Sequence, residues 1–314
     1  MGDESPEIIE TRADTHHRTV WLLVLFTGVI WGAGGLVSKG LVNDNVDAFA
    51  ITGIPLAAAA IVAWIYTLRK GVINKASMIA GIRLGLLNVA FPPLLFNLAY
   101  ETMPAGVVTL IISLGPVITA SVAHFAFDDE RFSRAKAAGL AASVSGVAVL
   151  SVSPGVIEGS SYRGLVFVLV GVLIGSSSAV LVRKEAVRYG TLPILAPQLT
   201  VASSVSLLIG PLLGRPLIPN GGFETWHLVA LLGIGLFASF GGFLSSVKAN
   251  QLGTTGQVSL IAYLIPVVGV SGGRLFFDEK LTSGVAIGGI LILLGMTVAG
   301  RASMKPTRTI RSSG

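Results

Sequence analysis

Apolar residues in this chain form long runs that are separated by short polar and basic segments. A helix needs about 20 apolar residues to cross a hydrocarbon layer of about 30 Å. Ten runs approach this length: residues 20–38, 46–67, 77–98, 105–126, 134–153, 163–183, 192–213, 226–246, 254–275 and 281–300. The pattern predicts an all-α polytopic membrane protein with ten transmembrane helices.

The second half of the chain repeats the first. Residues 99–128 return as residues 249–278 at an offset of 150. The shared positions include Gly106 and Gly256, Leu110 and Leu260, Pro116 and Pro266, and, after one dropped residue, Gly139 and Gly288, and Gly146 and Gly295. An odd number of helices in each unit makes the second copy enter the membrane from the opposite side. We therefore expect two inverted five-helix repeats.

The repeats set the expected domain boundaries. The first repeat covers residues 20–153 and the second covers residues 163–300, with tails at 1–19 and 301–314. Both tails are polar, and we expect them to be disordered. The acidic N-terminal segment has no cleavable signal pattern, so the first apolar run is expected to act as its own insertion signal.

Composition and charge agree with a membrane location. Hydrophobic residues make up 52% of the chain and charged residues only 12%, against about 25% charged residues in soluble domains. The mean hydropathy is +0.79. With the N-terminus inside, sixteen Lys and Arg residues fall on the cytoplasmic side and five outside. This bias predicts a cell (inner) membrane protein with both termini cytoplasmic, and it explains the net charge of +6 without a nucleic-acid partner.

Several short motifs appear in a characteristic order. Trp31 and Gly32 are followed by Lys39, prolines lie in the middle of the fourth and ninth apolar runs, and an acidic–basic turn precedes a Gly-rich last helix. In this order and duplication, residues 20–300 resemble EamA-type members of the drug/metabolite transporter superfamily. The resemblance implies a ten-helix carrier with a central cavity between the repeats, often an exporter of amino acids or other small metabolites. It does not specify a substrate.

The matched prolines Pro116 and Pro266 are candidates for the substrate pathway. A proline removes a backbone donor and kinks a helix, and exposed polar backbone is tolerated in a membrane only where protein or a water-lined cavity covers it. Ser113 precedes the first proline, and Ser259 and Tyr263 precede the second. A packing kink without substrate contact is the alternative.

Neutral polar side chains are the other candidates for recognition. Asn88 and Asn97 flank Pro92 and Pro93 on the third helix, where the two prolines should distort the helix. An amide donates and accepts hydrogen bonds at once, which suits a zwitterionic or hydroxylated solute. Trp31 offers a flat apolar wall and one donor.

Few charged groups lie close to the predicted spans. Glu101 is near the outer end of the third helix, where it is either a solvated loop residue or, facing the cavity, a site for a coupling proton or a substrate amine. Lys39 is at the outer end of the first helix and either snorkels to the interface or faces the cavity. Asp278 and Glu279, in a turn, are interpreted as interface salt bridges or helix N-terminal acids.

Together these features predict a secondary active transporter that exports a small organic metabolite, amino acid-like or drug-like, by alternating access. A proton gradient or the solute gradient would drive it. An uptake permease or a lipid-linked substrate flippase of the same fold is the alternative. A membrane-embedded enzyme is less favoured because the chain has no Cys and no HExxH motif, and a channel because no filter-like motif is present. We expect no cofactor and no metal, membrane lipid as a partner, and leave the oligomeric state open.

Overall fold

The computed structural model describes residues 6–126, 133–153, 161–252 and 255–303, which are almost entirely helical. The helices of the first half are α1 (Pro6–Asn43), α2 (Ala48–Lys70), α3 (Lys75–Leu84), the π-helix η1 (Gly85–Ala90), α4 (Phe91–Tyr100), α5 (Ala105–Ile112), α6 (Gly115–Ala126) and α7 (Arg134–Ser151). Those of the second half are α8 (Ser161–Tyr189), α9 (Thr191–Leu212), α10 (Thr225–Gly233), the π-helix η2 (Ile234–Gly241), α11 (Gly242–Leu252), α12 (Thr255–Phe277) and α13 (Ser283–Ser303).

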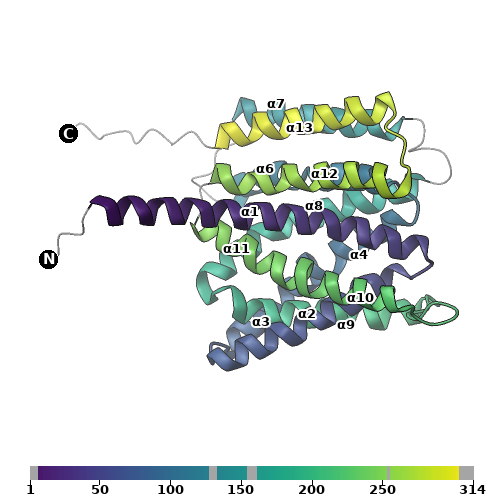
Figure 1. Ribbon diagram of the computed structural model, residues 1–314, viewed down its shortest axis with the longest axis horizontal. Coiled ribbons are helices and arrows are strands. Elements are labelled where there is room, and N and C mark those ends of the chain that lie inside the picture. Colours follow the sequence, from purple (N-terminus) through teal and green to yellow (C-terminus); the bar gives the residue numbers. More distant parts are fainter. Residues whose placement is uncertain (1–5, 127–132, 154–160, 253–254, 304–314) are drawn as a thin grey trace.

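The helices lie side by side in one bundle (Figure 1). Helix α1 begins and helix α13 ends at the same end of this bundle. We call the opposite end the distal end; there α1 finishes at Asn43, α4 at Tyr100, α9 at Leu212 and α12 at Phe277. This end carries most of the polar contacts described below.

Seven helical stretches of the described residues are long and apolar enough to cross a membrane. They correspond to the first, second, third, sixth, seventh, eighth and ninth predicted spans. The stretches Ala105–Thr119 and Ser283–Ala299 are apolar but shorter. The chain is therefore a multi-pass membrane protein, with helices also at the remaining predicted spans.

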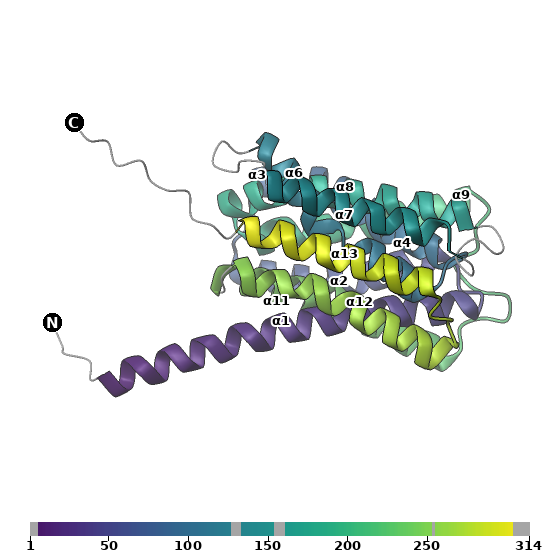
Figure 2. The same cartoon turned by 90° about the horizontal axis from the view of Figure 1, so that it is seen from above.

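The N-terminal segment differs from the expectation. Helix α1 starts at Pro6, so the predicted disordered tail is wrong from that residue onward. Proline fits the first turn of a helix because its missing N–H would have no partner there, and no Gly or Pro interrupts the next 21 residues. Figure 2 shows this part of α1 projecting beyond the other helices. Residues 304–314 of the predicted C-terminal tail lie outside the described residues.

Equivalent helices of the two halves pack against each other, α2 against α9 and α7 against α13. A Cβ atom on Gly139 would lie 2.5 Å from the carbonyl oxygen of Gly295, and one on Gly146 would lie 2.6 Å from that of Gly288. In the sequence repeat, Gly139 matches Gly288 and Gly146 matches Gly295. Each glycine of α7 therefore contacts the sequence match of the other one, and exchanging the two repeats gives the same pair of contacts. This exchange makes α7 and α13 antiparallel and relates the halves by a local two-fold axis.

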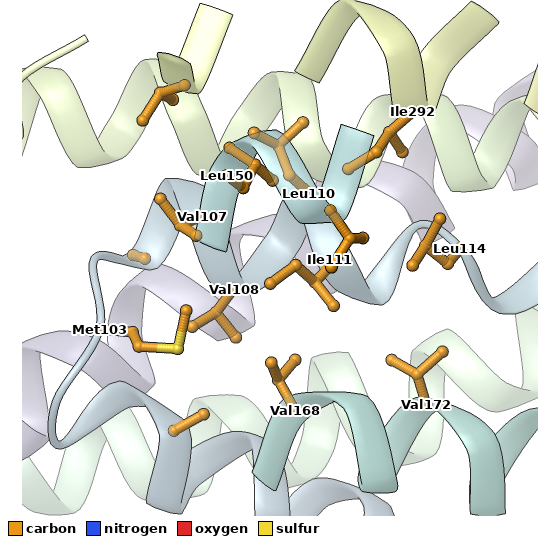
Figure 3. Packing of buried hydrophobic residues seen from close by; sticks show 14 of the residues in the cluster. Met103, Val107, Val108, Leu110, Ile111, Leu114, Leu150, Val168, Val172 and Ile292 are labelled. Atoms are coloured by element: carbon orange, nitrogen blue, oxygen red, sulfur yellow. The ribbon is translucent and has the colours of Figure 1, made fainter. Parts of the chain in front are cut away.

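The largest apolar cluster surrounds α5. Figure 3 shows Ile111 and Leu114 facing Val168 and Val172 of α8. Leu150 of α7 and Ile292 of α13 close the other side, and both are fully buried. Helix α5 is therefore held among helices from both halves of the chain.

Candidate functional site

Two π-helical segments occupy equivalent places in the two halves. The segment η1 lies between α3 and α4, and η2 lies between α10 and α11. Pro92 and Pro93, just after η1, cannot donate backbone hydrogen bonds, so the predicted distortion of this helix is present. In η2 the N–H of Gly242 donates to the carbonyl of Phe237, five residues back. Short π-helical insertions are common at functional sites.

Trp31 connects α1 to η2. Its indole Nε1 donates a hydrogen bond of 2.9 Å to the carbonyl oxygen of Ala238. The ring also packs edge-on against Phe243, with centroids 6.0 Å apart. Gly242 provides the space, because a Cβ atom there would collide with the indole nitrogen. The π-helix thus presents a carbonyl, and the other half of the chain supplies its donor.

Asn88 makes the corresponding connection from η1. Its Nδ2 donates to the hydroxyl of Ser178 at 3.1 Å and lies 3.5 Å from the carbonyl oxygen of Gly175, both on α8. Asn88 and Ala238 are 150 residues apart, the offset of the repeat. Each half therefore bonds the first helix of the other half at the same position of its π-helical segment.

The two candidate prolines have different surroundings. Pro116 is exposed and follows a break between α5 and α6, because Pro116 has no N–H to bond the carbonyl of Ile112. Pro266 is buried inside the continuous helix α12. The helix is therefore interrupted beside Pro116, whereas α12 continues through Pro266.

The polar residues before these prolines also point to different places. Ser113 is buried in the cluster around α5, and its hydroxyl donates to the carbonyl of Leu110 at 2.6 Å. The Tyr263 hydroxyl donates to Thr297 on α13 at 3.1 Å. Ser259 belongs to α12, and its side chain lies outside the described part of the structure. These contacts do not bring Ser113 and Tyr263 together.

Asn97 packs α4 against α2. Its Nδ2 donates to the hydroxyl of Thr52 at 2.9 Å, and that hydroxyl donates to the carbonyl of Ala48. Asn97 is only 7% exposed. Its amide therefore joins two helices within the first half of the chain, whereas Asn88 joins the two halves.

Glu101 takes part in an ion cluster at the distal end. Arg215, in the loop after α9, bonds Asp47 through Nε at 2.6 Å and Glu101 through Nη2. Asp47 also caps α2 by accepting the N–H of Phe49. Partial burial opposes the charge of Arg215, but its bonds with Asp47 and Glu101 outweigh this effect and raise the pKa of Arg215. The cluster ties the second half to two helix ends of the first.

A second polar group lies on the α12 side of the distal end. Lys39 Nζ donates to the carbonyl oxygen of Tyr100 at 2.7 Å. Glu279 accepts hydrogen bonds from the N–H groups of Ala105 and Gly106, the latter at 2.9 Å. The interpretation of Glu279 as a helix N-terminal acid is confirmed, although the helix that it caps, α5, belongs to the other half.

The family model for the EamA-like transporter family matches residues 18–152 and again residues 162–301. The chain belongs to the EamA-like transporter family.

Some curated relatives of this EamA transporter carry export names. The chain is 26% identical over 295 residues to a protein of Escherichia coli (strain K12) named "Probable amino-acid metabolite efflux pump", covering 88% of this chain and 93% of the relative. It is 25% identical over 310 residues to a "Probable terminal-alkyne amino-acid exporter" of Streptantibioticus cattleyicolor, covering 95% and 98%. A crystal structure with 20% identity has a TM-score of 0.66 and covers 94% of this chain and 99% of that one. This likeness shows the fold.

Sequence reasoning missed several residues that connect the halves of this EamA transporter. Arg215 was only one of five basic residues on the predicted outer side, and Asp47 was overlooked as an N-cap. His227 of α10 lies 3.2 Å from the Asp44 carboxylate at the end of α1. An acidic residue just before an apolar run is a known N-cap signal and would have identified Asp47. No comparable signal marks Ala238.

Proposed function

We propose that this EamA transporter is a secondary active exporter of a small organic metabolite and works by alternating access. In this proposal ten helical segments cross the membrane as two inverted five-helix repeats that rock against each other. The observation that carries the proposal is the pair of bonds from Trp31 to Ala238 and from Asn88 to Ser178. The two contacts join the repeats at corresponding positions of η1 and η2, and they provide an interface about which such a motion can occur.

The proposed orientation places the distal end outside the cell and both termini in the cytoplasm. It is supported by the excess of Lys and Arg at the opposite end. The polar bridges at the distal end would then close the outer side of the transporter. The conformation with these bridges is one in which a solute enters from the cytoplasm.

We propose an amino acid-like or drug-like solute as the substrate. The names of the two relatives support an amino acid-like solute. Trp31 and Asn88 are the first candidates for residues along the pathway, followed by Pro116 and Pro266. Lys39 and Glu101 would lie at its outer mouth.

The test compares the metabolites that accumulate outside cells expressing this chain with those outside cells expressing a Trp31→Ala, Asn88→Ala double variant at matched membrane abundance. We expect a small set of solutes in the medium of the first cells only. A change confined to the intracellular pool would contradict export and indicate uptake. No change in either pool, with an altered lipid distribution, would contradict the small-solute substrate and favour the flippase.

Two energy sources are compatible with the proposal, a proton gradient and the gradient of the solute itself. They are separated by transport into proteoliposomes with and without an imposed pH gradient. If protons drive transport through Glu101, the Glu101→Gln variant will lose gradient-driven transport and keep solute exchange. An unchanged response to the pH gradient would contradict that role of Glu101.

A further inference from the structure

The turn between α12 and α13 sends one side chain into the first repeat. Glu279 follows the end of α12 at Phe277, and its two carboxylate oxygens accept the N–H groups of Ala105 and Gly106. These are the first two residues of α5. Their N–H groups have no partner inside the helix, so the carboxylate of the second repeat completes a helix of the first.

The surroundings make room for this carboxylate. A Cβ atom on Gly106 would lie 3.3 Å from Glu279 Oε2, and one on Gly273 would overlap it. Gly106 lies on α5 and Gly273 on the last turns of α12. The carboxylate thus sits between two glycines of different repeats, where no larger residue leaves space for it.

The backbone conformation of the turn also directs the Glu279 side chain towards α5. Asp278 has a φ of 51°, in the left-handed region that few residues other than glycine adopt. The N–H of Glu279 then donates to the carbonyl of Gly273 at 3.2 Å. The chain reverses sharply after α12, which turns the Glu279 side chain back towards α5.

Electrostatics favour the same placement. The N-terminus of a helix carries a partial positive charge, so a carboxylate is stabilised there. Lys39 of α1 also attracts Glu279, while its ammonium group donates to the carbonyl of Tyr100. The Glu279 charge is therefore balanced by α5 and by α1, both in the first repeat.

Helix α5 is a separate segment of only eight residues. Its N-terminus is held by Glu279, and its C-terminus meets the break at Ser113 and Leu114 before α6. The equivalent helix α12 runs without a break through Pro266. A short helix with a bond at one end and a break at the other can tilt as a unit when the bond is released.

We propose that Glu279 is a latch that holds α5 in place and keeps the distal end closed, and that releasing it lets α5 tilt about the break at Ser113. This inference deepens the proposed alternating-access function and rests on it. Glu279 acts through the position of α5 and does not contact the solute.

The chain contains no cysteine, so a single introduced thiol can report on the latch. Thr109 of α5 is 1% exposed, and a Thr109→Cys thiol should react slowly with a membrane-impermeant maleimide added to the purified protein. Adding Glu279→Gln removes the charge and one acceptor oxygen. We expect the labelling rate to rise on the order of tenfold, because hydrogen bonds to charged groups are the stronger ones.

Asp278→Asn is the matched control. The Asp278 side chain is 99% exposed and pairs only loosely with Arg274, at 3.8 Å, and asparagine tolerates a left-handed backbone. This variant should leave the labelling rate unchanged. Gly273→Ala keeps every charge and displaces the carboxylate sterically, so it should raise the rate as Glu279→Gln does. Equal rates in Glu279→Gln, Gly273→Ala and Asp278→Asn would overturn the latch.

A second reporter separates latch release from misfolding. Ala202 lies on α9, is 0% exposed and belongs to an apolar cluster that contains no residue of α5. An Ala202→Cys thiol should therefore stay unreactive in all backgrounds if the fold is intact, and it should become reactive if a variant misfolds. Labelling does not require transport. A latch that opens in a protein without export activity would contradict the proposed function only, whereas export with no change in labelling would contradict the latch only.

Discussion

The indole nitrogen of Trp31 donates a hydrogen bond of 2.9 Å to the carbonyl oxygen of Ala238. The two residues belong to different repeats, and Ala238 lies in the π-helical segment η2. In a regular α-helix the N–H of Gly242 would bond the carbonyl of Ala238, but here it bonds the carbonyl of Phe237. The bond therefore supplies a donor to a carbonyl that regular helix geometry would have satisfied from within. Trp31 of α1 therefore connects the first repeat to the second.

Trp31→Phe tests this connection because it keeps an aromatic ring and removes only the donor. We expect the initial rate of export, normalised to membrane abundance, to fall about fivefold, since a neutral hydrogen bond contributes about 1 kcal/mol. Trp64→Phe removes the same group from a bond to Thr200 at an exposed position and should have a smaller effect. Equal effects of the two variants would contradict a specific role for Trp31.

Gly146→Ala tests the two-fold contact of α7 with α13. A Cβ atom at this position would lie 2.6 Å from the carbonyl oxygen of Gly288, so the helices must separate. Overpacking of this kind typically costs about 1–3 kcal/mol. We expect a lower midpoint for thermal aggregation in detergent. Gly233→Ala is the control, because no atom lies within 4 Å of a Cβ atom there, and its midpoint should match that of the unmodified protein.

Thr52→Val tests the buried bond between α2 and α4. The substitution leaves the amide of Asn97 without its acceptor, and an unsatisfied buried polar group costs about 1–3 kcal/mol. Thermal stability in detergent should fall. The Thr52→Val, Asn97→Leu double variant removes both partners and should regain part of the loss. If the double variant loses more stability than the two single variants lose together, this pairing is refuted.

Arg215→Gln removes the cation that Asp47 and Glu101 share. Two carboxylates then remain close together, so we expect lower thermal stability and partial recovery when Glu101→Gln is added. Added salt should reduce the difference, because the side chains of Arg215 and Glu101 are partly exposed. If the thermal stability of Arg215→Gln changes neither with salt nor with the second substitution, the cluster contributes nothing to stability.

The pH dependence of this cluster has a definite sign. The pKa of Arg215 is raised by its bonds with Asp47 and Glu101, so the stabilisation that its charge provides is complete below its ordinary pKa and is lost only as the pH rises through the higher folded value. Titration of Arg215 should therefore cause no loss of stability between about pH 7 and pH 10. Thermal midpoints of the unmodified protein and of Arg215→Gln across this range should differ by a constant amount.

Sequence alone indicated the duplicated architecture because the relevant signals are long or repeated. The apolar runs are longer than a helix of a soluble protein needs. The close contact of α7 with α13 is marked by four glycines, Gly139, Gly146, Gly288 and Gly295. The glycines could be matched along the sequence before their contact was known. Their exchange of partners follows from the two-fold relation.

The details of the site depend on contacts between distant segments. Ala238 carries no side-chain signal, and its role arises from a donor 207 residues away. Pro116 and Pro266 match in sequence, yet only the first follows a break in its helix. Glu101 is an unremarkable helix-end acid until the loop after α9 brings Arg215 to it. Local propensity cannot distinguish these outcomes because tertiary packing decides them.

Alternating access itself can be measured with two pairs of spin labels in the naturally cysteine-free chain, reconstituted in lipid. One pair, Asn43→Cys with Ser283→Cys, spans the distal end, and the other, Lys70→Cys with Arg188→Cys, spans the opposite end; all four positions are exposed. We expect the exported solute to shift the two distance distributions in opposite directions, with one end widening as the other narrows. Distances that widen together at both ends, or that never change while export proceeds, would contradict it.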